Sequence, residues 1–213
     1  MKKILAYGLR ILVAVLGTLG VGLELYHKGL FMLTYYTLLS NILVVGMSYY
    51  LLFRMVKDFD NMMQDSTLLR VKGALTMGIL LTFLVYHFML APFADASKFF
   101  RLENFLVHYI VPILFLLDWL ILDKRGVYKA KDAFYWTLLP LGYSIFALIK
   151  GYVFQIEIPG QENSPYPYFF LNIDRFGFLG VMKFILGISI AYLAMSGILY
   201  FIKMFRAGEK NES

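Results

Sequence analysis

The chain has 213 residues, of which 60% are hydrophobic and 16% charged, with a net charge of +6 and no cysteine. A soluble domain has about 45–50% apolar and about 25% charged residues, and a soluble chain of this length could not bury so much apolar surface. The lack of cysteine excludes disulfides, thiolate metal sites and a cysteine nucleophile. Basic residues flank apolar segments, which indicates contacts with membrane lipids and not with nucleic acid.

Six apolar stretches are long enough to cross a bilayer, which takes about 20 residues in a helix. The first follows Lys2 and Lys3, is interrupted by Arg10 and lacks a cleavage site, so we interpret it as an uncleaved helix and not as a signal peptide. The connections are short and rich in charge or turn formers. The sequence therefore predicts one all-α, polytopic membrane domain over residues 1–213, with spans at 4–23, 30–53, 71–91, 104–122, 133–154 and 176–202.

The distribution of lysine and arginine predicts the orientation, because these residues concentrate in cytoplasmic segments. Placing the N-terminus inside leaves five basic residues in the outer segments: Lys28, Lys98, Arg101, Lys150 and Arg175. The inner segments then hold thirteen, namely Lys2, Lys3, Arg54, Lys57, Arg70, Lys72, Lys124, Arg125, Lys129, Lys131, Lys203, Arg206 and Lys210. We therefore expect both termini to be cytoplasmic.

Most polar side chains within the spans fall toward the outer face in this orientation, and only Arg10 and Asp118 fall toward the inner face. Polar groups inside a bilayer are costly and usually line a bundle interior or a cavity. The outer group consists of Thr34, Thr37, Ser40 and Asn41 in the second span, His87 in the third, Asn104 and His108 in the fourth, and Lys183 in the sixth. At helical spacing Thr34, Thr37 and Asn41 share one face. A pocket between this face and the fourth span is expected, opening to the outer leaflet.

Each of these side chains also has a structural interpretation. A threonine or serine hydroxyl can bond to the carbonyl one turn earlier in its own helix. Asn41 and the histidines can form hydrogen bonds between helices, and Lys183 can extend its ammonium toward the membrane surface.

Several short motifs resemble those of a bacterial six-pass membrane family related to the eukaryotic androgen-induced and androgen-dependent membrane hydrolases. The first is Tyr36-Thr37-Leu38-Leu39-Ser40-Asn41, similar to the aromatic-Thr-x-x-Ser-Asn signature of that family. His108-Tyr109-Ile110-Val111-Pro112 with Asp118-Trp119 resembles its fourth helix, although the eukaryotic pattern has one more residue between the histidine and the proline. Lys150-Gly151 and Tyr166-Pro167-Tyr168-Phe169-Phe170-Leu171-Asn172 resemble its segment before the last helix, with Phe169 and Asn172 in place of proline and aspartate.

The resemblance implies a hydrolase or acyl-transfer enzyme that acts on a lipid ester in a bacterial cell membrane. The eukaryotic relatives are threonine hydrolases that cleave esters of fatty acids with hydroxy fatty acids. Met32-Leu33-Thr34-Tyr35 matches the nucleophile's context in the eukaryotic relatives, so the resemblance assigns the nucleophile to Thr34 and its base to His108. Thr37, in the bacterial signature, is the second candidate. Ser40, Asn41, His87, Asn104 and Lys183 are the expected pocket residues, and no cofactor is expected.

The chemistry is consistent with those residue types. A threonine hydroxyl needs a base within hydrogen-bond reach, and a neutral histidine can take its proton and return it to the leaving alcohol. Asn41, Asn104 or Lys183 could stabilise the oxyanion. No Gly-x-Ser-x-Gly motif is present, which excludes an α/β-hydrolase.

Two other functions remain open from sequence: a transporter or small-ligand carrier that uses the same pocket, and a non-catalytic membrane protein. A metal enzyme using His87, His108 and Glu24 is disfavoured, because no two of these residues have the spacing of metal ligands.

Overall fold

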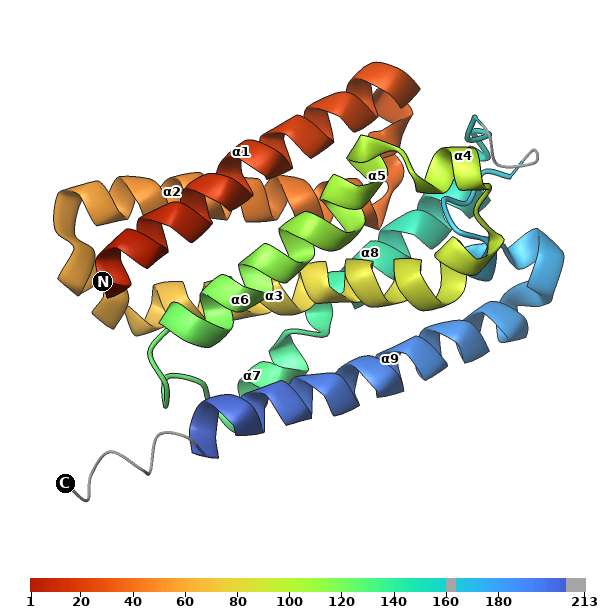
Figure 1. Cartoon of the computed structure of the whole chain (residues 1–213). Coiled ribbons are helices and arrows are strands. Elements are labelled where there is room, and N and C mark those ends of the chain that lie inside the picture. Colours follow the sequence, from red (N-terminus) through yellow and green to blue (C-terminus); the bar gives the residue numbers. More distant parts are fainter. Residues whose placement is uncertain (160–163, 206–213) are drawn as a thin grey trace.

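The computed structural model describes residues 1–159 and 164–205, which form helices and turns with no β-strand among them (Figure 1). Six helical segments in these ranges are long and apolar enough to cross a membrane, which confirms the predicted all-α fold with six such helices. They are Lys2–Lys28, Tyr36–Gln64, Ser66–Phe93, Leu102–Leu122, Ala130–Phe154 and Ile173–Met204. All but the second begin before their predicted ranges.

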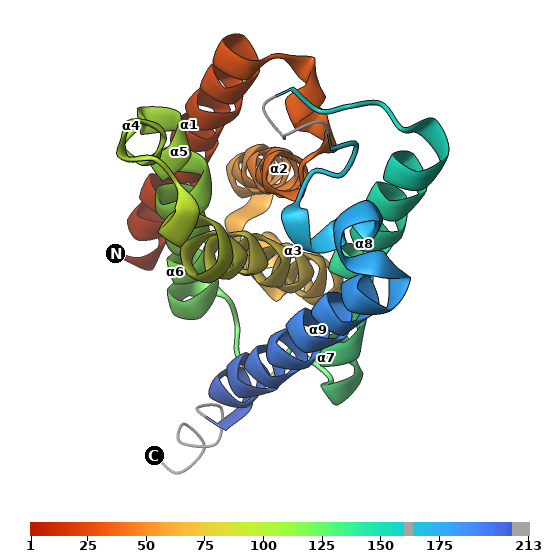
Figure 2. The same ribbon diagram turned by 90° about the vertical axis from the view of Figure 1, so that its right-hand side faces the viewer.

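The described residues contain nine α-helices, and all of them except α4 belong to the spans. The long ones are α1 (Lys2–Lys28), α2 (Tyr36–Gln64), α3 (Ser66–Val85), α6 (Val111–Leu122), α8 (Leu138–Ile149) and α9 (Ile173–Phe205). The short ones are α4 (Ala96–Phe99), α5 (Leu102–Phe105) and α7 (Ala130–Tyr135). Seen end-on, α1, α2, α3 and α6 pack as a four-helix group, with α7, α8 and α9 on the other side of α3 (Figure 2).

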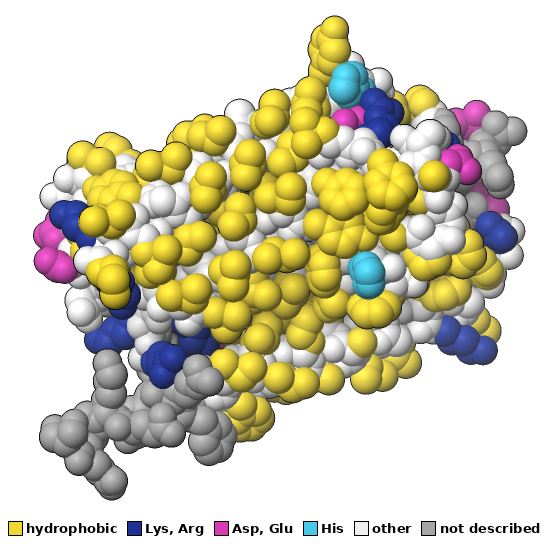
Figure 3. All heavy atoms as spheres, viewed as in Figure 1, with side chains coloured by type: hydrophobic (Ala, Val, Ile, Leu, Met, Phe, Trp, Pro, Cys, Tyr) yellow, Lys and Arg dark blue, Asp and Glu magenta, His cyan; other side chains and the backbone are white. Residues whose placement is uncertain are grey.

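The surface is that of a multi-pass membrane protein. Hydrophobic side chains cover most of the face between the two ends of the helices, whereas lysine, arginine and acidic side chains gather at those ends (Figure 3). Many large apolar side chains are exposed along the spans, including Leu186 at 61% and Ile190 at 59%. A broad apolar surface of this kind needs lipid as its solvent.

The second span begins later than predicted. Leu30–Thr34 forms a 3-10 turn, Tyr35 is extended (φ −91°, ψ 135°), and α2 begins only at Tyr36. Gly29 precedes the turn with φ 97°, a conformation that glycine adopts at little cost, so the chain reverses sharply after α1. The prediction that Thr34 and Asn41 share one face of a helix is therefore wrong, because the extended Tyr35 separates Thr34 from α2.

A π-helical turn lies within three of the spans, near the end of the bundle that holds the site described below. These turns are Tyr86–Leu90, Leu106–Ile110 and Lys150–Phe154. Pro112 follows the second of them and has no N–H to donate to the carbonyl of His108, one turn earlier. The missing hydrogen bond gives a reason for the wider turn around His108, and π turns inside helices are frequent at functional sites.

The segment before α9 is docked against the third π turn by one tight contact. The ring of Tyr166 lies so close to Gly151 that a Cβ added to Gly151 would be 2.2 Å from the ring. Only glycine permits this approach. Asn172 then accepts a hydrogen bond from Arg175 N at 3.0 Å and caps the start of α9. These contacts fix both ends of the short stretch that carries Tyr168.

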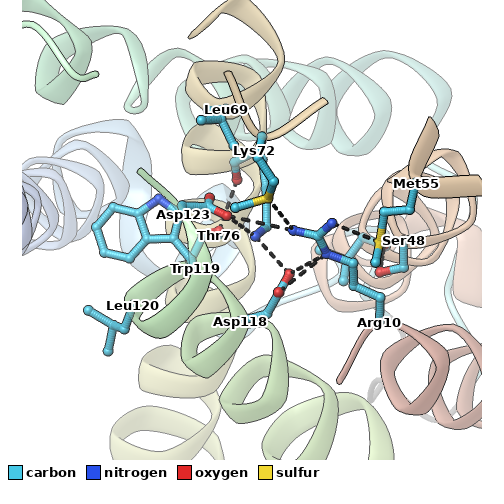
Figure 4. A network of polar contacts seen from close by, with 12 residues as sticks. Arg10, Ser48, Met55, Leu69, Lys72, Thr76, Asp118, Trp119, Leu120 and Asp123 are labelled. Atoms are coloured by element: carbon cyan, nitrogen blue, oxygen red, sulfur yellow. Dashed lines mark hydrogen bonds and ion pairs between the residues drawn. The ribbon is translucent and has the colours of Figure 1, made fainter. Parts of the chain in front are cut away.

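A buried ionic cluster ties four spans together at the opposite end of the bundle (Figure 4). We use this name for Arg10, Lys72, Asp118, Asp123 and Lys203, each at most 4% exposed. Arg10 Nε lies 3.3 Å from Asp118, and the Lys72 ammonium lies 2.7 Å from Asp118 and 2.6 Å from Asp123. Lys72 and Lys203 were counted as basic residues of the connecting segments, but the structure buries both inside the protein.

Uncharged groups complete the cluster. The Lys203 ammonium donates to the carbonyl oxygens of Trp119, Leu120 (3.2 Å) and Asp123 (3.1 Å), which lie at the C-terminal end of α6, where carbonyls lack helical partners and the helix dipole is negative. Arg10 donates to the sulfur of Met55 at 3.0 Å. Three cations and two carboxylates thus lie together away from solvent, and carbonyl oxygens and a thioether sulfur complete their contacts.

Candidate functional site

Three side chains from distant parts of the chain meet at the first turn of α2. The hydroxyl oxygen of Thr37 lies 3.3 Å from Nε2 of His108 and 3.3 Å from the phenolic oxygen of Tyr168. All three side chains are buried, being 7% to 9% exposed. A nucleophilic threonine needs a base within hydrogen-bond reach, and Thr37 has His108 at that distance.

The hydrogen bonds of His108 define which ring nitrogen is the acceptor. Its Nδ1 lies 3.1 Å from the backbone carbonyl oxygen of Asn104. A carbonyl oxygen only accepts, so Nδ1 carries the ring hydrogen, and Nε2 of the neutral ring is left as the acceptor. The Thr37 hydroxyl therefore donates to Nε2. The histidine is oriented as a base toward the threonine, at the long end of the hydrogen-bond range, as is common without substrate.

The ring of His108 is also fixed from one side. The ring of Tyr86 stacks on it with centroids 3.7 Å apart and planes inclined by 22°. The amide of Asn104 donates to the Tyr86 hydroxyl at 2.6 Å and to the carbonyl of Phe99 at 2.9 Å. Asn104, one of the expected pocket residues, thus holds the imidazole both through its carbonyl and through Tyr86.

Tyr168 completes the hydrogen bonds of Thr37. Its hydroxyl accepts from the backbone N–H of Thr37 at 3.3 Å, and its own hydrogen is directed at the Thr37 hydroxyl oxygen. Burial raises the pKa of Tyr168 to about 12, so the phenol keeps its proton at neutral pH. A neutral phenol remains a hydrogen-bond donor beside the threonine.

The helix start places a positive electrostatic potential at the same point. Tyr35 is the N-cap residue of α2, so Thr37 is the second residue of a 29-residue helix. The first N–H groups of a helix have no partner within the helix, and the dipole adds about half a positive charge at this end. Negative charge developing next to Thr37 would be stabilised there.

Ser40 and Asn41 lie behind the threonine and hold its backbone. Ser40 donates to the Thr37 carbonyl at 3.0 Å and is hydrogen-bonded to Thr82 at 2.8 Å. The amide of Asn41 donates to the carbonyls of Thr37 (2.8 Å) and Val107 (2.9 Å). Because both of these bonds use its nitrogen, Asn41 is not free to donate to an oxyanion. The two residues belong to the site as supports and not as the cavity lining that the sequence indicated.

A cavity of about 580 Å³ opens in front of the pair. Thr37, His108 and Tyr168 form part of its wall, and charged side chains line its rim. At the rim Lys28 pairs with Glu24 at 2.8 Å, and Arg101 pairs with Glu103 at 2.6 Å. The cavity is within the usual size range for a small-molecule site and is closed at its base by a hydroxyl and an imidazole.

Three of the expected site residues lie elsewhere. The Thr34 hydroxyl donates to the carbonyl of Phe31 at 2.7 Å, within its own turn, and does not line the cavity. His87 is exposed, lies 3.3 Å from the hydroxyl of Tyr109 and is outside the cavity wall. Lys183 is exposed on α9. For His87 the reason is the direction of its side chain on the third span, where the neighbouring Tyr86 is buried and His87 is exposed.

Sequence reasoning missed the roles of Tyr86 and Tyr168. Tyr168 lies within the quoted motif before α9, so a signal was present, but its contact with a residue 131 positions away could not be inferred. Among the described residues, no group of three or more histidine or acidic side chains is placed to hold a metal ion.

Comparisons with protein-family models, with curated proteins and with solved structures give no match for this chain.

Proposed function

We propose that the chain is an integral membrane hydrolase that cleaves a lipid ester, with Thr37 as the nucleophile and His108 as its general base. One observation carries this proposal: the Thr37 hydroxyl donates to the unprotonated ring nitrogen of a buried histidine whose other nitrogen is held by a carbonyl. This is the arrangement of nucleophile, base and orienting group that covalent catalysis requires. Thr37, in the bacterial signature, replaces Thr34 as the first candidate.

In the first half of the reaction, the Thr37 oxygen attacks the ester carbonyl carbon while its proton passes to His108 Nε2. The carbonyl π electrons move to the carbonyl oxygen and give a tetrahedral oxyanion. When the oxyanion collapses, the bond to the alcohol oxygen breaks, and His108 gives the proton to the leaving alcohol. The acyl group remains as an ester on Thr37.

The oxyanion would lie at the N-terminal end of α2, where the helix dipole and N–H groups stabilise negative charge. Tyr168 supplies a second donor. Its hydroxyl hydrogen points at the Thr37 oxygen in the resting site, and is released to bond to the oxyanion once that oxygen becomes part of the ester.

The second half returns the enzyme to its starting state. A water molecule enters through the cavity, loses a proton to His108 and attacks the acyl carbon. The acid leaves, and the proton returns to the oxygen of Thr37. The 580 Å³ cavity has room for this water after the alcohol has left.

A small-ligand carrier in the membrane is the second candidate, and the volume of the cavity favours it. A carrier does not need a hydroxyl hydrogen-bonded to an imidazole acceptor, so this pair favours the hydrolase. Flux of ester or free acid into proteoliposomes without cleavage would instead support the carrier.

A fluorophosphonate probe should modify Thr37 covalently. The hydroxyl oxygen displaces fluoride from phosphorus, and His108 takes the proton, so labelling depends on the pair and not on a particular lipid. Peptide mass spectrometry of the labelled protein should place the adduct on Thr37. The same protein with His108→Ala should remain unlabelled, and Thr34→Ala should be labelled normally. An adduct on Thr34 would show that the nucleophile is the other threonine.

Both termini are proposed to be cytoplasmic, because the inner segments hold more basic residues than the outer ones. Leaving out the buried Lys72 and Lys203 reduces the thirteen inner residues to eleven, against five outer ones. Reporter fusions after Leu122 and at the C-terminus should report the cytoplasm, and fusions near Asp95 or Glu162 should report the outside. The Thr37–His108 pair then lies in the outer half of the bilayer of a cell membrane. An external C-terminus would reverse this placement but leave the site geometry unchanged.

A further inference from the structure

A second cavity begins at the same threonine and runs between α3, α8 and α9. We call it the slot. Its walls include Leu81 and Thr82 of α3, Leu141 and Ser144 of α8, and Ile188 and Ser189 of α9. The larger cavity, which we call the outer cavity, has no wall residue from α8 or α9. The two cavities therefore extend from the site in different directions.

The two cavities meet at the reacting group. Thr37, Tyr86, Leu90 and Tyr168 line both of them. The carbonyl of an ester is likewise the point at which two chains meet, the acyl chain and the alcohol. A substrate with its carbonyl at Thr37 must therefore place one part in each cavity.

The slot has a far smaller volume than the outer cavity. Its volume is about 60 Å³, against about 580 Å³. A water molecule needs about 10–15 Å³ on this measure, so the volume of the slot corresponds to roughly four to six waters. Such a space suits one unbranched hydrocarbon chain, and a branched or ring-containing group does not fit.

The exposure of the walls indicates how a chain enters. Leu81 and Thr82 of α3 are buried, whereas Leu141, Ser144 and Ile188 are half-buried. On the third span only Val85 and Leu90 among the slot residues are half-buried, whereas all slot residues of α8 and α9 except Tyr192 are. Because α8 and α9 belong to segments that are long and apolar enough to cross a membrane, we infer that their side of the slot is the one nearer to the bilayer.

We propose that the slot binds the acyl chain of the substrate, which enters sideways from the bilayer between α8 and α9, while the alcohol part occupies the outer cavity. This assignment rests on the proposed hydrolase function. It makes the substrate an ester of an unbranched long-chain acid, and it makes Ser144 and Ser189 determinants of acyl-chain length.

The first test compares chain lengths in the full-length protein in lipid nanodiscs. Ser189→Trp and Ser144→Trp each fill the slot from a different helix, and Ile190→Trp is the matched control because its side chain is 59% exposed beside Ser189. We expect both slot variants to lower kcat/KM for p-nitrophenyl palmitate by about tenfold or more, because the added indole blocks an acyl chain long enough to reach Ser144 and Ser189. They should leave kcat/KM for p-nitrophenyl butyrate within about twofold, because its short acyl chain stays near Thr37. The control should change neither substrate. Thermal melting of each variant identifies any loss of folding.

The second test does not require hydrolysis. Palmitic acid carrying a terminal diazirine is photolysed in the nanodiscs, and the modified residues are located by mass spectrometry. Cross-links should fall on residues of α8 and α9 that line the slot, should be lost in Ser189→Trp and should persist in Ile190→Trp.

The two proposals fail in different ways. If the native protein cleaves no ester but the cross-links follow this pattern, the slot binds acyl chains and the hydrolase proposal is wrong. If esters are cleaved but both slot variants lower kcat/KM for the palmitate and the butyrate ester equally, the slot proposal is wrong and the hydrolase proposal stands. The same conclusion follows if esters are cleaved and the cross-links spread evenly over the lipid-facing surface.

Discussion

Thr37→Ala and His108→Ala are each expected to lower kcat/KM for a lipid ester by about a thousandfold, and the double variant should lower it no further. Thr37 donates to the only unprotonated nitrogen of His108, so neither group performs the chemistry without the other. Members of one catalytic unit are non-additive for this reason. The measurement is steady-state hydrolysis by the purified protein in detergent or nanodiscs, with the melting temperature followed in parallel.

Two variants serve as controls for this experiment. Thr37→Ser keeps a hydroxyl in the same place with a freer rotamer, and should retain part of the activity. Thr34→Ala removes only a hydroxyl that bonds within its own turn, and should be fully active. If Thr34→Ala abolishes hydrolysis and Thr37→Ala leaves it unchanged, the nucleophile is Thr34. Equal, additive and modest losses in all variants would show that the polar residues only support the fold.

The six apolar helices could be predicted from sequence because span length and hydrophobicity are local properties of the chain. The clustering of polar side chains at one end followed from the alternation of helix direction. Thr37 and His108, placed at a similar depth on the second and fourth spans, are indeed in contact. What the pattern could not provide was the one extended residue, Tyr35, that separates Thr34 from α2. A run of aromatic and β-branched residues weakens a helix, but the point at which it begins depends on tertiary contacts.

The direction of each side chain was less predictable than its depth. His87 has the more reactive side chain, yet its neighbour Tyr86 faces the site and stacks on His108. A π turn changes the direction, about the helix axis, of every side chain that follows it in the helix. Three such turns lie in the described spans. Helical spacing at a constant 100° per residue therefore loses accuracy at this end of the bundle.

The ionic cluster could not be predicted, because it depends on pairs far apart in sequence. Lys72 lies 51 positions from Asp123, and Arg10 lies 108 positions from Asp118. A lysine near the end of a span is ordinarily a topology signal. In this fold Lys72 is fully buried and acts between helices, so the charge count that predicts the orientation includes residues with a different role.

Asp118→Asn is expected to lower the free energy of unfolding by about 3–5 kcal/mol, the largest effect on stability that we predict. The carboxylate lies 3.3 Å from Arg10 Nε and 2.7 Å from the Lys72 ammonium, and none of the three side chains is exposed to solvent. Removing the shared anion leaves two cations near each other in a low-dielectric interior, with Asp123 as the one remaining carboxylate. Chemical unfolding of the protein in mixed micelles gives the measurement.

The matched comparison uses an ion pair on the surface and a second variant in the cluster. Asp95 pairs with Lys98 at 3.5 Å, and both side chains are more than 70% exposed. Asp95→Asn should therefore leave the free energy of unfolding unchanged. Arg10→Met combined with Asp118→Asn should cost less than the sum of the two single changes, because the double variant removes the isolated guanidinium along with its partner. Arg10 already contacts the sulfur of Met55, so an apolar thioether suits this position. If Asp118→Asn and Asp95→Asn change the free energy of unfolding equally, the cluster contributes little to the stability of the bundle.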